Sequence, residues 1–128
     1  MVQQVTQGIK VSVETNFEGT FYKNYKVQYS FSYRVTIENQ GKDTVQLFNR
    51  FWEIKDALNN IETVEGAGVI GKRPILKSGE SHSYTSGCLL TSPIGSMSGY
   101  YVFINHFDTS NFQVFIPSFK LNAPFALN

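Results

Sequence analysis

The sequence has a single cysteine, Cys88, and this scarcity excludes several kinds of chemistry. One cysteine forms no intrachain disulfide and builds no cysteine-based zinc site. Its apolar neighbours Leu89 and Leu90 predict a core or half-buried thiol. A nucleophilic cysteine needs a base and surroundings that lower its pKa, and the local sequence supplies neither. No G-x-S-x-G elbow occurs either, so we expect no catalytic residue and no enzyme.

Long runs of one chemical character are also missing. Eleven basic and ten acidic residues give a net charge of +1, and no run of Lys or Arg is long enough to follow a phosphate backbone. We therefore expect no nucleic-acid partner. No stretch approaches the roughly 18 apolar residues that span a membrane, and the first residues lack the pattern of a secretory signal. These absences predict a cytoplasmic protein without a membrane partner.

Charged residues are few, at 16%, whereas aromatic residues, at 15%, are abundant. Tyr and Phe favour the half-buried surface of a pleated sheet, so the composition favours strands over helices. A chain of 128 residues without an internal linker predicts one domain, residues 1–128.

Strict alternation from Tyr25 to Ile37 is the clearest structural signal. Odd positions are aromatic or aliphatic and even positions are polar, which predicts a long strand with one buried face. A turn follows at residues 39–43, where Gly41 permits positive φ. In the next strand, residues 44–55, the apolar phase shifts from odd to even positions. Such a shift predicts a β-bulge or burial on both faces.

Further strands are expected along the rest of the chain, with turns between them at intervals of about 8–12 residues. The turn after residue 55 is placed at Asp56–Asn60. No helix longer than a turn is expected, and the tail from Leu121 is expected to fray. About seven antiparallel strands predict an all-β fold, a β-sandwich. The remaining strands are expected at residues 9–13, 61–65, 81–90, 97–107 and 112–116, the last ending at Pro117.

Gly66, Gly68 and Gly71 spell G-x-G-x-x-G, with Lys72 and Arg73 directly after. In a dinucleotide site this motif opens a helix whose N-terminus binds pyrophosphate. Pro74 disfavours helical backbone at the residue before it, so no helix begins here. Two interpretations stay open. The glycines form a folded edge loop, or their N–H groups form an anion-binding nest for pyrophosphate or a nucleotide beside the two cations.

Three other groups of residues are weaker candidates for function. His106 and Asp108 could ligate a divalent metal, although surface histidines near turns are the commoner reading. An acidic group could serve acid-base chemistry or form a solvated face: Glu53, Asp56, Glu62 and Glu65. The aromatics Phe48, Phe51 and Trp52 could bind a protein partner or lie in the core. In a regular strand, Phe51 and Trp52 point to opposite faces, so one of them should point away from the core.

The residues Asn49–Ile54 and Val64–Pro74 resemble the ApaG family, also called CorD or DUF525. The similarity covers nearly the whole chain to Phe119, although Lys72 and Arg73 stand where members of the family often have other residues. It continues through the sequences LKSGE (76–80), YTSGC (84–88), PIGSMSGYY (93–101) and IPSF (116–119).

This resemblance implies an immunoglobulin-like or fibronectin type III-like β-sandwich, a bacterial cytoplasmic protein, and genetic links to cobalt and magnesium homeostasis. Similar domains in eukaryotic proteins imply a protein-interaction module. We therefore expect a non-enzymatic module with a protein partner and no cofactor, and a homodimer is left open. A pyrophosphate or nucleotide site at the glycine loop is the alternative, and direct divalent-metal binding is a weaker one.

Overall fold

The computed structural model describes residues 1–58 and 60–127, with side chains to Phe125. Asn59, in the turn expected at Asp56–Asn60, and Asn128, at the end of the tail, lie outside the described residues. The elements are β1 (Val2–Thr6), β2 (Ile9–Lys23), β3 (Lys26–Asn39), β4 (Val45–Asp56), β5 (Ile61–Ala67), β6 (Ile75–Leu76), β7 (Ser81–Leu90), β8 (Ile94–Asn105), β9 (Asn111–Asn122) and the short 3-10 helix η1 (Pro124–Leu127).

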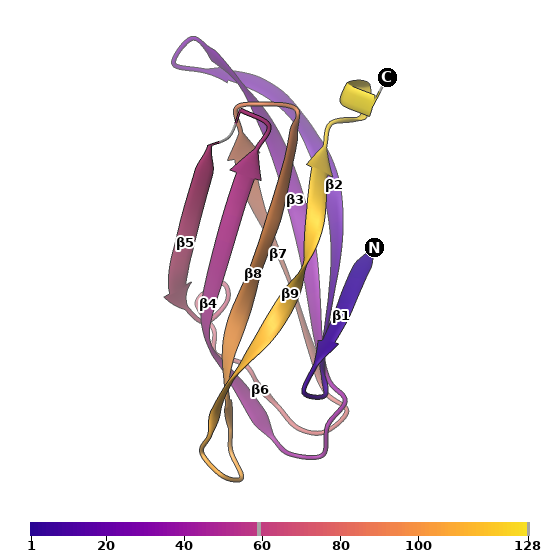
Figure 1. The fold of residues 1–128 in the computed structure, drawn as a ribbon, viewed down its shortest axis with the longest axis vertical. Helices are drawn as coiled ribbons and strands as arrows, with labels where there is room; N and C mark the ends of the chain where they lie inside the picture. Colours follow the sequence, from indigo (N-terminus) through magenta and orange to yellow (C-terminus); the bar gives the residue numbers. More distant parts are fainter. Residues whose placement is uncertain (59, 128) are drawn as a thin grey trace.

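Two antiparallel sheets face each other (Figure 1). One has the strand order β1-β2-β3-β7, and the other has the order β5-β4-β8-β9, with β6 paired to β4. β9 lies against β1 and β2, which closes one side of the sandwich. On the other side, β5 and β7 are the edge strands of their sheets. The expected all-β sandwich is thereby confirmed.

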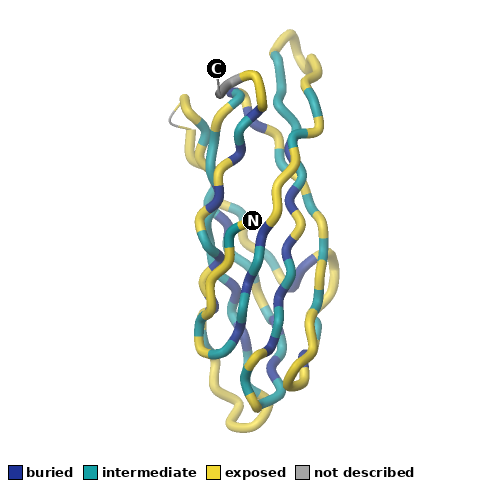
Figure 2. The backbone as a smooth tube through the Cα atoms, turned by 90° about the vertical axis from the view of Figure 1, so that its right-hand side faces the viewer, coloured by how far each residue is buried: buried dark blue, intermediate teal, exposed yellow. Residues whose placement is uncertain are grey.

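The alternation in β3 places its apolar side chains between the sheets. Phe31, Tyr33, Val35 and Ile37 are buried, whereas Arg34 between them is exposed. Burial of each such side chain contributes on the order of 1.5–3 kcal/mol, which holds the strand in its register. Along the strands, buried positions recur between more exposed ones (Figure 2).

The bulge predicted in the second long strand is present in β4. Its pairing with β8 shifts register between Leu47 and Asn49. A bulge inserts one extra residue and changes which positions face the core. Beyond it, Trp52 points inward and is 3% exposed, whereas Phe51 lies on the outer face. The inference that one of these two aromatics points away from the core is therefore confirmed.

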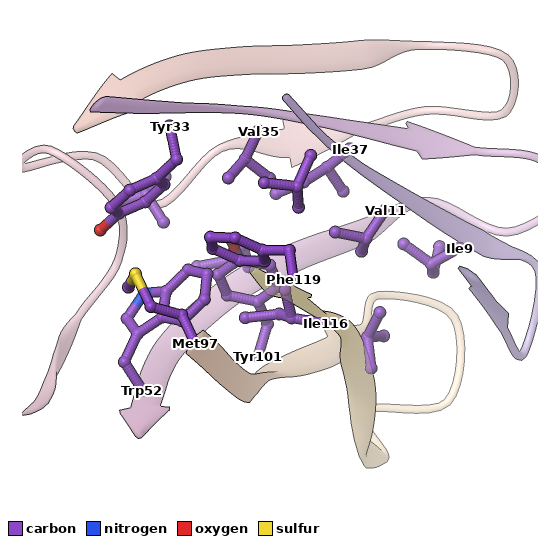
Figure 3. Close-up of a cluster of buried hydrophobic side chains, with 14 of the residues drawn as sticks. Ile9, Val11, Tyr33, Val35, Ile37, Trp52, Met97, Tyr101, Ile116 and Phe119 are labelled. Carbon is purple, nitrogen blue, oxygen red and sulfur yellow. The ribbon is translucent and has the colours of Figure 1, made fainter. Parts of the chain in front are cut away.

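The core is formed by side chains from both sheets. In Figure 3, Tyr33, Val35 and Ile37 of β3 face Trp52 and Phe119 of the other sheet. The rings of Tyr33 and Trp52 lie 5.4 Å apart between centroids, within the range of favourable aromatic pairs.

Two expectations about strand ends were wrong. A short strand was expected at residues 9–13, but β2 continues to Lys23 because its whole length pairs with β3. The last strand was expected to end at Pro117, but β9 continues to Asn122. Pro117 lies at a register shift between β8 and β9, where a missing N–H is tolerated. The described part of the tail is not frayed, because Leu121 and Ala123 are fully buried.

Candidate functional site

The end of the β2–β3 hairpin extends beyond the other strands at one end of the molecule (Figure 1). The ladder closes at the pair Lys23 and Lys26, so Asn24 and Tyr25 form a two-residue turn. Their φ angles are +53° and +63°, as in a type I′ turn. Asn suits the first position of such a turn, but the second normally holds Gly. Tyr25 is therefore in a backbone conformation that bulky residues rarely adopt.

The side chains at this hairpin tip, residues 21–26, are aromatic, basic and exposed. Tyr25 is 103% exposed, Tyr22 is 80% exposed and Phe21 is 41% exposed. Lys23 and Lys26 are exposed between these rings. Sequence reasoning missed the tip because Tyr25 continues the odd-numbered alternation of β3 and was expected to lie in the strand. The doublet Asn24-Tyr25 was the available signal, since Asn often begins a hairpin turn.

The three aromatics proposed from the sequence as partner-binding residues do not share a surface. Trp52 belongs to the core, so its place in that set was wrong; the bulge in β4 fixes its direction. Phe51 stacks on Tyr100 with centroids 5.1 Å apart, and both line an outer groove of about 340 Å³. Phe48 is covered by the guanidinium of Arg73, whose Cζ lies 3.7 Å from the ring centroid.

The structure explains why glycine stands at each of the three glycine positions of the G-x-G-x-x-G motif: a side chain there would collide with a neighbour or strain the backbone. A Cβ on Gly66 would lie 2.8 Å from the Arg50 guanidinium nitrogens. Gly68 has φ +62°, and a Cβ there would lie 2.1 Å from the Lys72 carbonyl oxygen. Gly71 has φ +70° beside Ile70, in the turn that joins Val69 to Lys72. The glycines therefore shape an edge loop, here called the glycine loop, residues 66–73.

Several backbone N–H groups of this loop are hydrogen-bonded within the protein. The N–H of Gly68 donates to the Phe48 carbonyl at 2.8 Å, and the Val69 and Lys72 N–H groups donate to each other's carbonyls. Arg73 lies on Phe48 and donates from Nε to its carbonyl at 3.0 Å. Internal hydrogen bonds therefore occupy the backbone donors of Gly68, Val69 and Lys72, which argues against a nest built on Gly66, Gly68, Gly71, Lys72 and Arg73.

The candidate metal ligands His106 and Asp108 make other contacts. His106 Nε2 lies 2.9 Å from Gln46 Oε1. Asp108 accepts hydrogen bonds from the Ser110 hydroxyl and backbone N–H, which lower its carboxyl pKa. The described residues contain no group of three or more His, Cys, Asp and Glu side chains that could hold a metal ion together.

Cys88 is a half-buried thiol, as expected, and it donates to Met97 Sδ at 3.8 Å. Burial raises its pKa to about 11, with a smaller contribution from the charge of Glu62. At neutral pH the group is a thiol, whereas nucleophilic attack requires the thiolate.

The class of protein is now defined: a two-sheet antiparallel β-sandwich with a protruding hairpin. No helix in the described chain is long and apolar enough to cross a membrane. The model of the family described as ApaG domain, DUF525, matches residues 20–105, and the chain belongs to this family. The family expected from the sequence motifs is thereby confirmed.

Individual relatives agree with this assignment. The chain is 41% identical to Protein ApaG of Brucella abortus (strain S19) and 43% identical to Protein ApaG of Methylobacterium sp. (strain 4-46). In both cases 124 residues align, which is 97% of this chain and 95% of the relative. A crystal structure from Bordetella pertussis is 36% identical, with a TM-score of 0.81 over 91% of this chain and 94% of that chain.

Proposed function

We propose that this chain is a non-enzymatic protein-interaction module that docks through the β2–β3 hairpin tip. The observation that carries the proposal is Tyr25, a fully exposed aromatic held at φ +63°. A left-handed conformation raises the free energy of a residue that has a side chain by about 1–2 kcal/mol. The described part of the chain offers the Tyr25 ring no packing that would offset this strain. Strained residues of this kind cluster at functional sites.

The composition of the tip supports a protein partner. Tyr is enriched among residues that dominate binding energy at protein interfaces, because a rigid amphipathic ring gives contact area at little entropic cost. Tyr22 and Tyr25 supply two such rings at the end of a regular hairpin.

The charge of the tip specifies the partner further. Lys23 and Lys26 flank the turn, and residues 20–29 contain no acidic side chain. The nearby Glu18 accepts a hydrogen bond from the Ser32 hydroxyl at 2.7 Å. A complementary surface is an apolar pocket that receives an aromatic ring and has Asp or Glu on its rim. The expected link to cobalt and magnesium homeostasis belongs, in this proposal, to that partner.

Photo-cross-linking in bacterial cells tests the proposal. The cross-linking residue p-benzoylphenylalanine replaces Tyr22 in one variant and Phe107 in a matched control. Phe107 is an 83% exposed aromatic in the β8–β9 turn, at the other end of the molecule in Figure 1. We expect position 22, and not position 107, to form a discrete adduct with one or a few proteins.

The adduct is then challenged by substitution elsewhere in the tip. Tyr25→Gly should remove it while the chain stays folded. Equal adducts from both positions, or an adduct that survives both Tyr25→Gly and Lys23→Glu, would contradict the proposal. Adducts between two copies of this chain would instead identify the tip as a self-association surface.

A further inference from the structure

A second site lies on the open side of the sandwich, between the glycine loop and β7. A cleft of about 140 Å³ opens there between the two sheets. Its polar lining comes from three strands, and part of its apolar wall comes from the glycine loop. The residues that matter for its chemistry are Tyr33, Arg50, Ile70, Gly71, Tyr84 and Ser86.

Arg50 is a half-buried cation whose position is fixed. Its Nη1 donates to the carbonyls of Ala67 and Gly68, both at 3.0 Å. In the described part of the chain the ion pair found is Lys55–Glu53, so Arg50 has no carboxylate partner there. Nη2 and Nε have no protein acceptor among the described residues, and no side-chain polar atom there is both buried and unpaired. These nitrogens therefore contact solvent.

Tyr84, which also lines the cleft, adds a hydroxyl donor. Tyr84 and Tyr101 share a hydrogen bond between their hydroxyl oxygens. Tyr101 is fully buried, and its hydroxyl has no other protein partner among the described residues. A buried hydroxyl should donate its proton, so Tyr101 donates to Tyr84. The proton of Tyr84, which lines the cleft, is then free for another acceptor.

The phenol groups keep their protons. Burial raises the pKa of Tyr84, and it also raises the pKa of Tyr33 against the opposing effect of a hydrogen bond from Ser86. Burial, and then the positive charge of Lys72 in the glycine loop, lower the pKa of His82 on β7. Glu62 faces Cys88, further along the same edge.

The cleft wall contains a residue with a strained backbone conformation, Ile70. Ile70 has φ +47°, which is an outlier for a β-branched residue, and it is 61% exposed. Asn or Gly would relax this position of the turn. The fold of the loop therefore does not explain Ile70, and strain of this kind marks candidate functional positions.

We infer that this cleft binds one small tetrahedral oxyanion of the phosphate class. Arg50 supplies the charge and two free donor nitrogens. Tyr33 and Tyr84 accept hydrogen bonds from Ser86 and Tyr101, so their own hydroxyl protons supply further donors. The site is separate from the backbone nest, because every donor is a side chain. Its volume is below the roughly 300 Å³ of ordinary ligand pockets, so it admits a phosphate group and excludes a nucleotide base.

An NMR titration of the full chain with inorganic phosphate tests the inference. We expect saturable shifts confined to the Arg50 side-chain Nε–H and the amides of Ile70, Gly71 and Ser86. Arg50→Gln should weaken binding about tenfold or more, because a hydrogen bond to a charged group is lost. Arg34→Gln is the matched control, since Arg34 is exposed on β3 outside the cleft. It should leave the affinity unchanged.

Arg50 also donates hydrogen bonds to the Ala67 and Gly68 carbonyls, so Arg50→Gln could weaken binding by disturbing the glycine loop. A second variant that leaves these hydrogen bonds intact separates the two effects. Tyr33→Phe removes one hydroxyl donor from the cleft and should weaken phosphate binding several-fold. A parallel titration with O-phosphoserine distinguishes free phosphate from a phosphate carried on a larger molecule. If millimolar phosphate moves none of these resonances, or if both variants bind as the parent does, the inference is overturned. Diffuse shifts over surface lysines would overturn it as well.

Discussion

The guanidinium of Arg50 occupies the space that a side chain at Gly66, on the neighbouring strand, would fill. The two residues are cross-strand partners in the β4–β5 ladder, and a Cβ on Gly66 would lie 2.9 Å from Arg50 Cζ. Because Gly66 has no side chain, Arg50 can reach the Ala67 and Gly68 carbonyls and fix the start of the glycine loop. A motif that resembles a phosphate-binding fingerprint thus accommodates an arginine.

Alanine substitutions at the three motif glycines should lower the free energy of unfolding by different amounts. Gly68→Ala should cost about 3 kcal/mol or more, because its Cβ would collide with a backbone carbonyl and its φ is left-handed. Gly66→Ala should cost about 1–3 kcal/mol, because the pinned guanidinium must move. Gly71→Ala should cost about 1 kcal/mol, because only its φ is unfavourable. Urea unfolding measures all three, and an equal cost at each would contradict this account of the loop.

Replacing the strained tyrosine of the hairpin tip should stabilise the protein. Tyr25→Gly makes the turn Asn-Gly, the favoured sequence for type I′. We expect the free energy of unfolding to rise by about 1 kcal/mol, or the melting temperature by about 3–5 °C. Asn24→Gly is the control and should give no such gain, because Asn already suits its position. A destabilised Tyr25→Gly variant would show that the ring supports the fold.

Cys88 should react slowly in the folded protein. With a pKa of about 11, its thiolate fraction near pH 8 is far below that of an ordinary cysteine. We expect iodoacetamide to alkylate the folded chain roughly a hundredfold more slowly than the urea-unfolded chain. Mass spectrometry over time measures both rates. Similar rates in the two states would show that the thiol is neither shielded nor raised in pKa.

His82 should make stability depend on pH in a defined direction. Burial, followed by the charge of Lys72, lowers its pKa in the folded state. The unfolded chain then binds more protons at mildly acid pH, so His82 contributes stability above about pH 6.5 that is lost as pH falls through its folded pKa. Urea midpoints between about pH 7.5 and pH 5 should fall less in His82→Gln than in the parent. If the urea midpoints of the parent and of His82→Gln fall equally with pH, the lowered pKa assigned to His82 is contradicted.

The sequence predicted the fold well where side chains carry a two-residue period. The alternation in β3 and the phase shift in β4 appear in the structure as a buried face and a bulge. β2 was harder, because residues 14–16 are polar and exposed, and only pairing with β3 extends the strand to Lys23. Backbone pairing has no residue signature of its own.

The candidate sites were predictable only in part. The glycine motif identified the loop but not its internal hydrogen bonds, because hydrogen bonding within a loop depends on its conformation. Arg50 lies far from Tyr84 and Ser86 in the sequence, and only the meeting of β4 and β7 across the open side brings them to one cleft. Tyr25 was assigned to the strand because its apolar character fitted the alternation; a positive φ cannot be read from a tyrosine.

Binding of Tyr25→Gly to the protein identified by cross-linking tests the central claim most directly. Isothermal titration of that purified partner compares the parent chain, Tyr25→Gly, and Phe107→Ala as an aromatic control outside the tip. We predict that Tyr25→Gly binds at least about tenfold more weakly while unfolding at higher urea, and that Phe107→Ala binds as the parent does. Unchanged affinity in the stabilised Tyr25→Gly variant would contradict the account.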